Sequence, residues 1–167
     1  NCSKTLFIGM PTFNEERYIK SAIESLRKQT YVDWVLFISD NTSTDNTSNI
    51  CTTISENDNR ILYHRQEVNI GLKENFNFVY DEFINKSKCK YFMWAQSDDI
   101  WEPTYLETCI KLLKTNKSAG VSFTGMDNID SFGHVIRQYP SFKRFTANNK
   151  FISQLKYLFE PELLGKC

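Results

Sequence analysis

The sequence predicts an α/β fold in which a mostly parallel sheet lies between helices. Short apolar runs alternate along the chain with amphipathic stretches of helical periodicity. The longer apolar runs are continuous, which is typical of strands that are buried on both faces of a sheet. Neighbouring parallel strands require crossover connections, and the strand–helix–strand order provides a helix for each of them.

Five apolar runs are predicted strands. The first, second and fourth of them, residues 6–10, 34–38 and 91–95, are each five residues long. Two shorter runs, residues 61–63 and 121–123, complete the series. Runs of this length, bounded by polar residues, fit the strands of a parallel sheet.

Each of the first four strands is followed by a stretch whose apolar residues repeat at the i, i+3, i+4, i+7 spacing of one helix face. The fourth helix is expected to begin near Pro103, because proline is favoured in the first helical turn. The four stripes are Ile19, Ala22, Ile23 and Leu26; Thr47, Ile50, Cys51 and Ile54; Phe76, Val79, Tyr80 and Phe83; and Leu106, Cys109, Ile110 and Leu113.

The segment after the fifth predicted strand is less periodic. Residues 130–133 have the composition of a turn, which Asp127 and Asp130 are expected to shape. Residues 151–159 are predicted to form one more helix.

Composition excludes several classes of protein. The 167 residues fit one domain, and 20 basic residues cancel 20 acidic ones, so we expect no nucleic-acid partner. Two histidines and five scattered cysteines without a Cys-x-x-Cys pair do not indicate a zinc site, and they favour a reducing, cytoplasmic compartment. No run approaches the roughly 20 apolar residues that span a bilayer, so no transmembrane segment is predicted in this chain.

Polar segments follow the first four predicted strands. These segments are residues 11–16, 39–47, 69–73 and 96–99. Because the carboxyl ends of parallel strands share one edge of the sheet, we expect the four segments to converge there, where ligands bind in open α/β sheets.

Structural roles are open alternatives for three of the four segments. Asn14 is a residue type that commonly caps the N-terminus of a helix, and so is Thr44 or Asp45 before the second helix. Gly71 would serve a turn that needs a positive φ angle. Asp98 and Asp99 fit a structural role less well, because adjacent carboxylates repel each other and these two directly follow a core strand; a bound divalent cation would relieve that repulsion.

Five motifs give the chain a resemblance to family 2 glycosyltransferases, which have the GT-A fold, a Rossmann-like α/β/α sandwich. The resemblance covers roughly residues 4–133. The motifs, in order, are Pro11-Thr12-Phe13-Asn14-Glu15, Ser25-Leu26-Arg27-Lys28-Gln29-Thr30, Asp40-Asn41-Thr42-Ser43-Thr44-Asp45, Asn69-Ile70-Gly71 and Ser97-Asp98-Asp99-Ile100-Trp101-Glu102-Pro103.

The resemblance implies a role for individual residues in binding a nucleotide-sugar. Thr12 and Glu15 would line the nucleotide pocket. Asp40 would accept the ring N3–H of uracil or thymine in a charge-assisted hydrogen bond. Lys73 would contact the diphosphate, whereas capping of a helix explains Asp45 equally well.

The resemblance further implies a magnesium or manganese ion. Asp98 takes the last position of the family's D-x-D signature and would hold the ion at the diphosphate, with Asp99 as a second metal or sugar contact. Gln96 departs from the signature, because the family often has aspartate at that position. Its amide would still hydrogen-bond a ribose hydroxyl, but the site carries one negative charge fewer.

The predicted organisation is a single glycosyltransferase domain, residues 1–167, that is truncated at its C-terminus. Residues 1–123 would bind the nucleotide-sugar and residues 124–167 would begin the acceptor side. Family 2 enzymes invert the configuration of the sugar by direct displacement, with a carboxylate as the base that deprotonates the acceptor. We expect that base beyond the chain, since Glu160 and Glu162 have the context of a surface loop.

The predicted function is transfer of a sugar from a nucleoside-diphosphate sugar to a hydroxyl of a saccharide or lipid-linked saccharide, in the biosynthesis of surface polysaccharide or glycoconjugate. In the full protein, this part would lie in the cytoplasm or at the inner face of a membrane. Two alternatives are a non-catalytic GT-A-like nucleotide-binding module (or inactive fragment) and a pyrophosphorylase of related fold. The glycine-rich loop usual in pyrophosphorylases is absent after the first predicted strand. The sequence does not indicate the donor base, the sugar or the oligomeric state.

Overall fold

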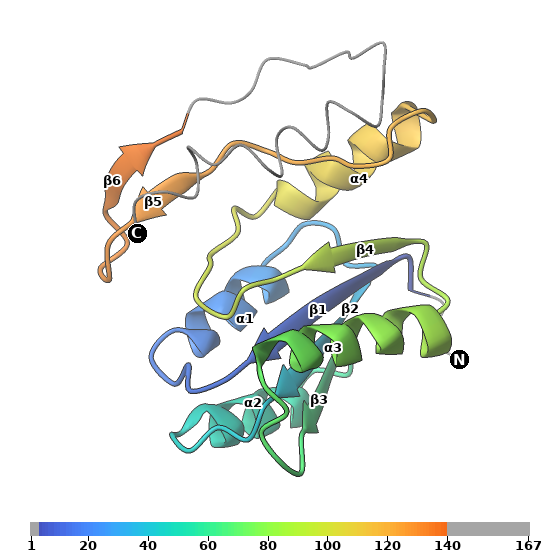
Figure 1. The fold of residues 1–167 in the computed structure, drawn as a ribbon. Helices are drawn as coiled ribbons and strands as arrows, with labels where there is room; N and C mark the ends of the chain where they lie inside the picture. The colour runs from blue at the N-terminus through green and yellow to red at the C-terminus, as the bar shows by residue number, and fades with distance from the viewer. Residues whose placement is uncertain (1–3, 140–167) are drawn as a thin grey trace. The chain divides into compact units, whose positions relative to one another are not determined.

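A computed structural model describes residues 4–139 of the chain (Figure 1). It divides into two compact units, Asn1–Ser122 and Phe123–Cys167. The first unit contains the parallel sheet with its helices, and the described part of the second contains a hairpin. Among the described residues, no helix is both long and apolar enough to cross a membrane.

The first unit is built on a four-stranded sheet whose strand order is β3-β2-β1-β4. Its strands are β1 (Leu6–Thr12), β2 (Trp34–Asp40), β3 (Ile61–Arg65) and β4 (Tyr91–Trp94). Every neighbouring pair is parallel. The order places β1 and β2 at the centre, and both are buried along their whole length. The predicted parallel α/β sheet is therefore confirmed.

Helices alternate with these strands as the apolar spacing predicted. They are α1 (Ile19–Arg27), α2 (Thr47–Glu56), α3 (Leu72–Lys86) and α4 (Tyr105–Thr115). Each predicted stripe lies within one of them, and α4 begins two residues after Pro103.

The alternation of side chains along β1 and β2 divides the core into two layers. Residues at even positions of both strands, such as Ile8 and Leu36, pack against α1 and α2. Residues at odd positions, such as Phe7 and Phe37, pack against Val79 of α3. Figure 1 accordingly shows α3 on one face of the sheet and both α1 and α2 on the other.

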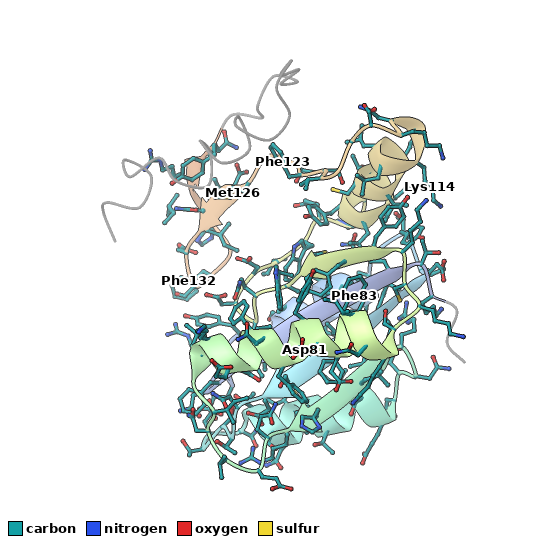
Figure 2. The ribbon with its side chains drawn as sticks, turned by 45° about the vertical axis from the view of Figure 1, so that its right-hand side comes forward. Asp81, Phe83, Lys114, Phe123, Met126 and Phe132 are labelled. Carbon is teal, nitrogen blue, oxygen red and sulfur yellow. The ribbon has the colours of Figure 1, made fainter. Side chains whose placement is uncertain are left out.

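The layer under α3 is rich in aromatic rings. Phe7 stacks on Phe92 of β4, and the ring of Phe83 lies 4.9 Å from that of Phe92. Figure 2 labels Phe83 and Asp81 on α3; Asp81 is exposed. The close approach of α3 to β1 needs glycine at position 9, since a Cβ there would lie 2.5 Å from Val79 Cγ1.

The second unit contains an antiparallel hairpin of β5 (Asp127–Ile129) and β6 (Val135–Gln138). The predicted turn over residues 130–133 is confirmed, and Gly133 has a φ angle of 86°. Asp130 shapes it by accepting hydrogen bonds from the backbone N–H groups of Phe132 and His134; Figure 2 labels Phe132. Asp127 lies in β5 and not in the turn.

The predicted strand at residues 121–123 is wrong. Val121 and Phe123 are 66% and 62% exposed, and no strand is assigned there. Ser122 between them donates its hydroxyl to the carbonyl of Cys109 in α4. Residues 121–123 alternate apolar, polar and apolar side chains as a strand does, but a strand also needs a partner strand, and none of the described strands pairs with this segment. The predicted helix over residues 151–159 lies outside the described residues, as do Glu160 and Glu162.

Candidate functional site

The loops after β1 and β2 are joined into one layer by hydrogen bonds. The backbone N–H of Asn14 donates to Ser43 Oγ at 2.9 Å, and the N–H of Thr44 donates to Asn14 Oδ1 at 2.8 Å. The N–H of Glu15 donates to Thr47 Oγ1 at 2.8 Å. The polar segments after the first two strands therefore meet, as predicted from the topology.

Asp45 has a structural task in this layer. One carboxylate oxygen accepts the N–H of Thr47 at the start of α2, and the other accepts the N–H of Glu16. Partial burial favours the neutral carboxyl, but these hydrogen bonds outweigh it and lower the pKa of Asp45. The helix-capping interpretation of Asp45 agrees with this geometry.

Two non-glycine residues of the layer have left-handed backbone conformations. Asn14 has a φ angle of 56° and Thr42 one of 62°. Asparagine tolerates this region, whereas a β-branched threonine is strained in it. Such strain persists only where the surroundings hold the backbone in place, and it is frequent at binding sites.

Thr12, Asp40 and Arg65 form one row across the carboxyl edge of the sheet. Thr12 is the register partner of Asp40, and Asp40 is the register partner of Arg65. Thr12 is 4% exposed, and its hydroxyl has no hydrogen-bond partner among the described residues. A buried hydroxyl of this kind is a group that a ligand or a water molecule would satisfy.

Asp40 is fully buried, with 0% exposure. Its Oδ1 accepts the N–H of Ser43 at 2.8 Å, and its Oδ2 accepts the hydroxyl of Tyr63 at 2.7 Å and Arg65 Nη1 at 2.8 Å. These bonds use most of the acceptor capacity of the carboxylate. The contact to a nucleotide base stays a prediction, and in this conformation Asp40 holds the loop and the edge strand.

The turn between β3 and α3 is fixed by Asn41. Its amide donates to Asn69 Oδ1 and accepts the N–H of Ile70, both at 2.9 Å. Gly71 has a φ angle of 84°, so the predicted need for glycine there is confirmed. Lys73 follows in the first turn of α3, with a side chain that is 86% exposed and 3.8 Å from Glu74. It is free to move toward a bound anion, but nothing in the described residues aims it at the site.

The acidic turn after β4 is open to solvent. Gln96, Asp98 and Asp99 are exposed, and Ser97 between them is 6% exposed. Partial desolvation and then the charge of Asp98 raise the pKa of Asp99. Partial burial, followed by the charges of Asp98 and Asp45, raises the pKa of Glu15.

The sheet topology shows which predicted residues share an edge. Because β1 and β4 are parallel neighbours, the acidic turn after β4 and the joined loops after β1 and β2 leave the sheet at the same edge, and the charge of Asp98 contributes to the raised pKa of Glu15. Within residues 4–139, no group of three or more His, Cys, Asp or Glu side chains could hold a metal ion by itself.

Sequence reasoning missed several polar residues that support the site. Arg65 and Tyr63 lie on β3, and Asn75 on α3 bonds to both the hydroxyl and the carbonyl of buried Ser39. The i, i+2 spacing of Tyr63 and Arg65 was a signal that both lie on the same face of the sheet, but only the register shows that Asp40 lies on that face too. The asparagines carried no such signal, because amide side chains are common in loops.

Comparison with known proteins agrees with this picture. The profile of glycosyl transferase family 2 matches residues 7–163. An uncharacterized glycosyltransferase of Methanocaldococcus jannaschii is 29% identical over 162 residues, which are 95% of this chain and 54% of that protein. The chain therefore spans about half the length of this curated relative.

Two solved structures resemble the fold. S. aureus TarS (residues 1–349) in complex with UDP-GlcNAc has a TM-score of 0.59 at 19% identity, with coverage of 75% of this chain and 40% of that one. A mannosyltransferase from Pyrobaculum calidifontis in complex with GDP-Man and Mn²⁺ has a TM-score of 0.58 at 17% identity, with coverage of 66% and 32%. These likenesses confirm the predicted GT-A architecture.

Proposed function

The chain belongs to glycosyl transferase family 2, and from this premise we propose that it provides the donor-binding part of an inverting glycosyltransferase. The donor is a nucleoside-diphosphate sugar, and the acceptor is a hydroxyl of a saccharide or lipid-linked saccharide. The observation that carries the proposal is that Glu15 follows β1 and Asp98 follows β4, two parallel neighbouring strands whose carboxyl ends share one edge of the sheet. Open α/β sheets bind their ligands at this edge.

The proposed pocket has a buried end and an exposed end. Thr12 and the layer supported by Asp40 form the buried end, which suits the nucleoside. Glu15, Gln96, Asp98 and Asp99 form the acidic end. The unpaired hydroxyl of Thr12 supports this assignment, because a nucleoside offers both donors and acceptors. Lys73 is proposed as a mobile contact to the diphosphate.

The acidic end fits a magnesium or manganese ion. Both ions prefer oxygen ligands and are commonly held by one or two carboxylates together with substrate phosphates. Asp98 and Asp99 would provide the carboxylates, and the diphosphate would complete the coordination. Partial desolvation, followed by the negative charge of Asp98, raises the pKa of Asp99, and a bound cation would relieve the repulsion between the two carboxylates.

In such a site the ion supplies Lewis-acid stabilisation of the negative charge on the departing nucleoside diphosphate. The residues of this chain would orient the donor, and Asp98 and Asp99 would hold the ion to which the diphosphate binds. We assign no catalytic base to the described residues: Asp127 belongs to a strand of the hairpin and Asp130 to its turn. We therefore propose that the 167-residue chain binds donor but transfers sugar poorly. We further propose that residues 124–167 begin the acceptor side.

A calorimetric titration with UDP, GDP and dTDP, each with and without Mn²⁺, tests the proposal. We expect one nucleotide to bind more tightly with Mn²⁺, and this gain should disappear in Asp98→Ala. Asp81→Ala is the matched control, because Asp81 is an exposed aspartate on α3 and is not part of the proposed site. Absence of binding by all three nucleotides would refute the proposal.

A binding module without chemistry is the second candidate, favoured by Gln96 in place of a common aspartate. A module would bind nucleotide without a Mn²⁺-dependent gain. The same titration separates the two, since only the donor-binding part of a metal-dependent enzyme should respond to both Mn²⁺ and the loss of Asp98.

A further inference from the structure

Two buried polar side chains, one in the last turn of α1 and one two residues past its end, have no part in the pocket proposed above. Ser25 is 8% exposed and Gln29 is 3% exposed. Burial of a polar group costs free energy unless hydrogen bonds replace those it made to water. Both side chains have partners in the segment that follows Asp98 and Asp99.

Gln29 links α1 to the start of α4. Its Nε2 donates to the carbonyl of Glu102 at 2.7 Å, and its Oε1 accepts the N–H of Leu106 at 2.9 Å. The N–H of Leu106 lies in the first turn of α4, where backbone donors have no partner within the helix. Thr104, the N-cap residue of α4, makes no capping bond with its side chain. Gln29 therefore caps α4 from another element of the fold.

Ser25 fixes the chain directly after the acidic turn. Its hydroxyl donates to the carbonyl of Ala22 at 2.7 Å and accepts the N–H of Trp101, two residues after Asp99, at 3.2 Å. At the other end of the turn, the N–H of Ala95 donates to the carbonyl of Gly9 at 2.9 Å. Residues 96–100 are thus held between a bond to β1 and a bond to α1.

We propose that Ser25 and Gln29 are positioning residues that set the geometry of Asp98 and Asp99 for a cation bound with the diphosphate. The inference rests on the proposed function. Binding of a cation by two carboxylates and a diphosphate requires a defined backbone path through the acidic turn. The turn is exposed. Within it, the N–H of Asp99 makes only a long hydrogen bond, of 3.5 Å, to the carbonyl of Gln96. Its path is therefore set by its two ends.

Three variants separate this role from a general contribution to folding. Ser25→Ala removes the acceptor of the Trp101 N–H and leaves the helix intact. Gln29→Glu keeps an oxygen for the N–H of Leu106 but loses the bond to the carbonyl of Glu102. Ser21→Ala is the control, since it makes the same change at an exposed position of the same helix.

The first measurement is the affinity of the 167-residue chain for UDP, determined once with Mn²⁺ present and once with a chelator that removes Mn²⁺. Loss of one hydrogen bond that orders the turn should reduce the Mn²⁺-dependent gain by about five-fold in Ser25→Ala. The affinity measured with chelator should stay unchanged, and Ser21→Ala should match the wild type. A reduction of equal size with and without Mn²⁺ would overturn the inference, because it would mean a general loss of structure.

The second measurement needs no ligand. Amide hydrogen exchange over residues 96–102 should be faster in Ser25→Ala and Gln29→Glu, with exchange in β1 and β2 unchanged. Unchanged exchange over residues 96–102 would also overturn the inference. Failure of the wild-type chain to bind any nucleotide would instead refute the proposed function, and with it the positioning role, which depends on that function.

Discussion

Arg65 Nη1 lies 2.8 Å from Asp40 Oδ2, although the Asp40 side chain is 0% exposed and that of Arg65 is 41% exposed. The pair joins the tip of β3 to the tip of β2, and Arg65 Nη2 also donates to the carbonyl of Ser43 in the following loop. A buried carboxylate depends on such partners, because removal of one partner leaves an uncompensated charge inside the protein. The floor of the proposed pocket is therefore held by an ion pair.

Loss of this pair should destabilise the chain. We expect Arg65→Met to lower the free energy of unfolding, by less than the loss of a partner costs in a fully buried pair, because Arg65 is partly solvated. The double variant Asp40→Asn/Arg65→Met should recover part of that loss, since it leaves no charge unpaired. Urea denaturation of both variants measures the effect, and equal stability of the single and double variants would contradict this account.

Thr42 offers a test of backbone strain in the loop after β2. Its φ angle of 62° is costly for a β-branched residue and costs glycine nothing. We expect Thr42→Gly to raise the free energy of unfolding by about 1 kcal/mol, after allowance for the greater flexibility of glycine in the unfolded chain. Thr42→Ala is the control, because it removes the same polar group and keeps the Cβ. A gain of equal size in Thr42→Ala would show that strain is not the cause.

Gly9 sets the distance between β1 and α3. A Cβ at this position would lie 2.5 Å from Val79 Cγ1, so Gly9→Ala forces the helix or the strand to move. We expect a loss of about 2 kcal/mol in the free energy of unfolding, which is typical of overpacked cores. Gly9→Ala/Val79→Ala should be more stable than the sum of the two single effects predicts. Simple additivity in thermal denaturation would argue against the contact.

Asp58 should make stability sensitive to acid. Hydrogen bonds from Arg60, helped by Arg27, lower the pKa of Asp58 from 3.8 to about 2. A carboxylate whose pKa is lower in the folded than in the unfolded chain stabilises the fold. This contribution is fully present above the pKa of the group in the unfolded chain, and it is lost as the pH falls toward the pKa in the folded chain. The wild type should therefore be more stable than Asp58→Asn at neutral pH, and the difference should shrink between about pH 4 and pH 2.

Denaturation by urea at a series of pH values checks this, with Asp81→Asn as a control at an exposed aspartate. A difference that stays constant down to pH 2 would exclude the ion pairs of Asp58 as its source.

The core elements were predictable from the sequence because their apolar periodicity is strong. The strands around Ile8 and Leu36 and the helices behind them follow directly from that pattern. The joining of the loops after β1 and β2, in which the N–H of Asn14 donates to Ser43, followed from topology, since parallel strands end at one edge.

The partners of side chains were not predictable in the same way. The pairing of Asp40 with Arg65 joins residues 25 positions apart, and no local pattern indicates it. Gln29 belonged to a recognisable motif, but its capping of α4 depends on where two helices pack. The segment 121–123 had the composition of a strand without a partner to pair with, which a single sequence does not reveal.

We propose that Glu15, Asp98 and Asp99 surround one cation-dependent nucleotide site. Amide NMR spectra recorded with UDP and trace Mn²⁺ test it most directly, because paramagnetic broadening depends on distance from the ion. We predict selective broadening of signals from these three residues and from Thr12, and its disappearance in Asp98→Ala. Broadening centred elsewhere on the chain, or unchanged in Asp98→Ala, would contradict the account.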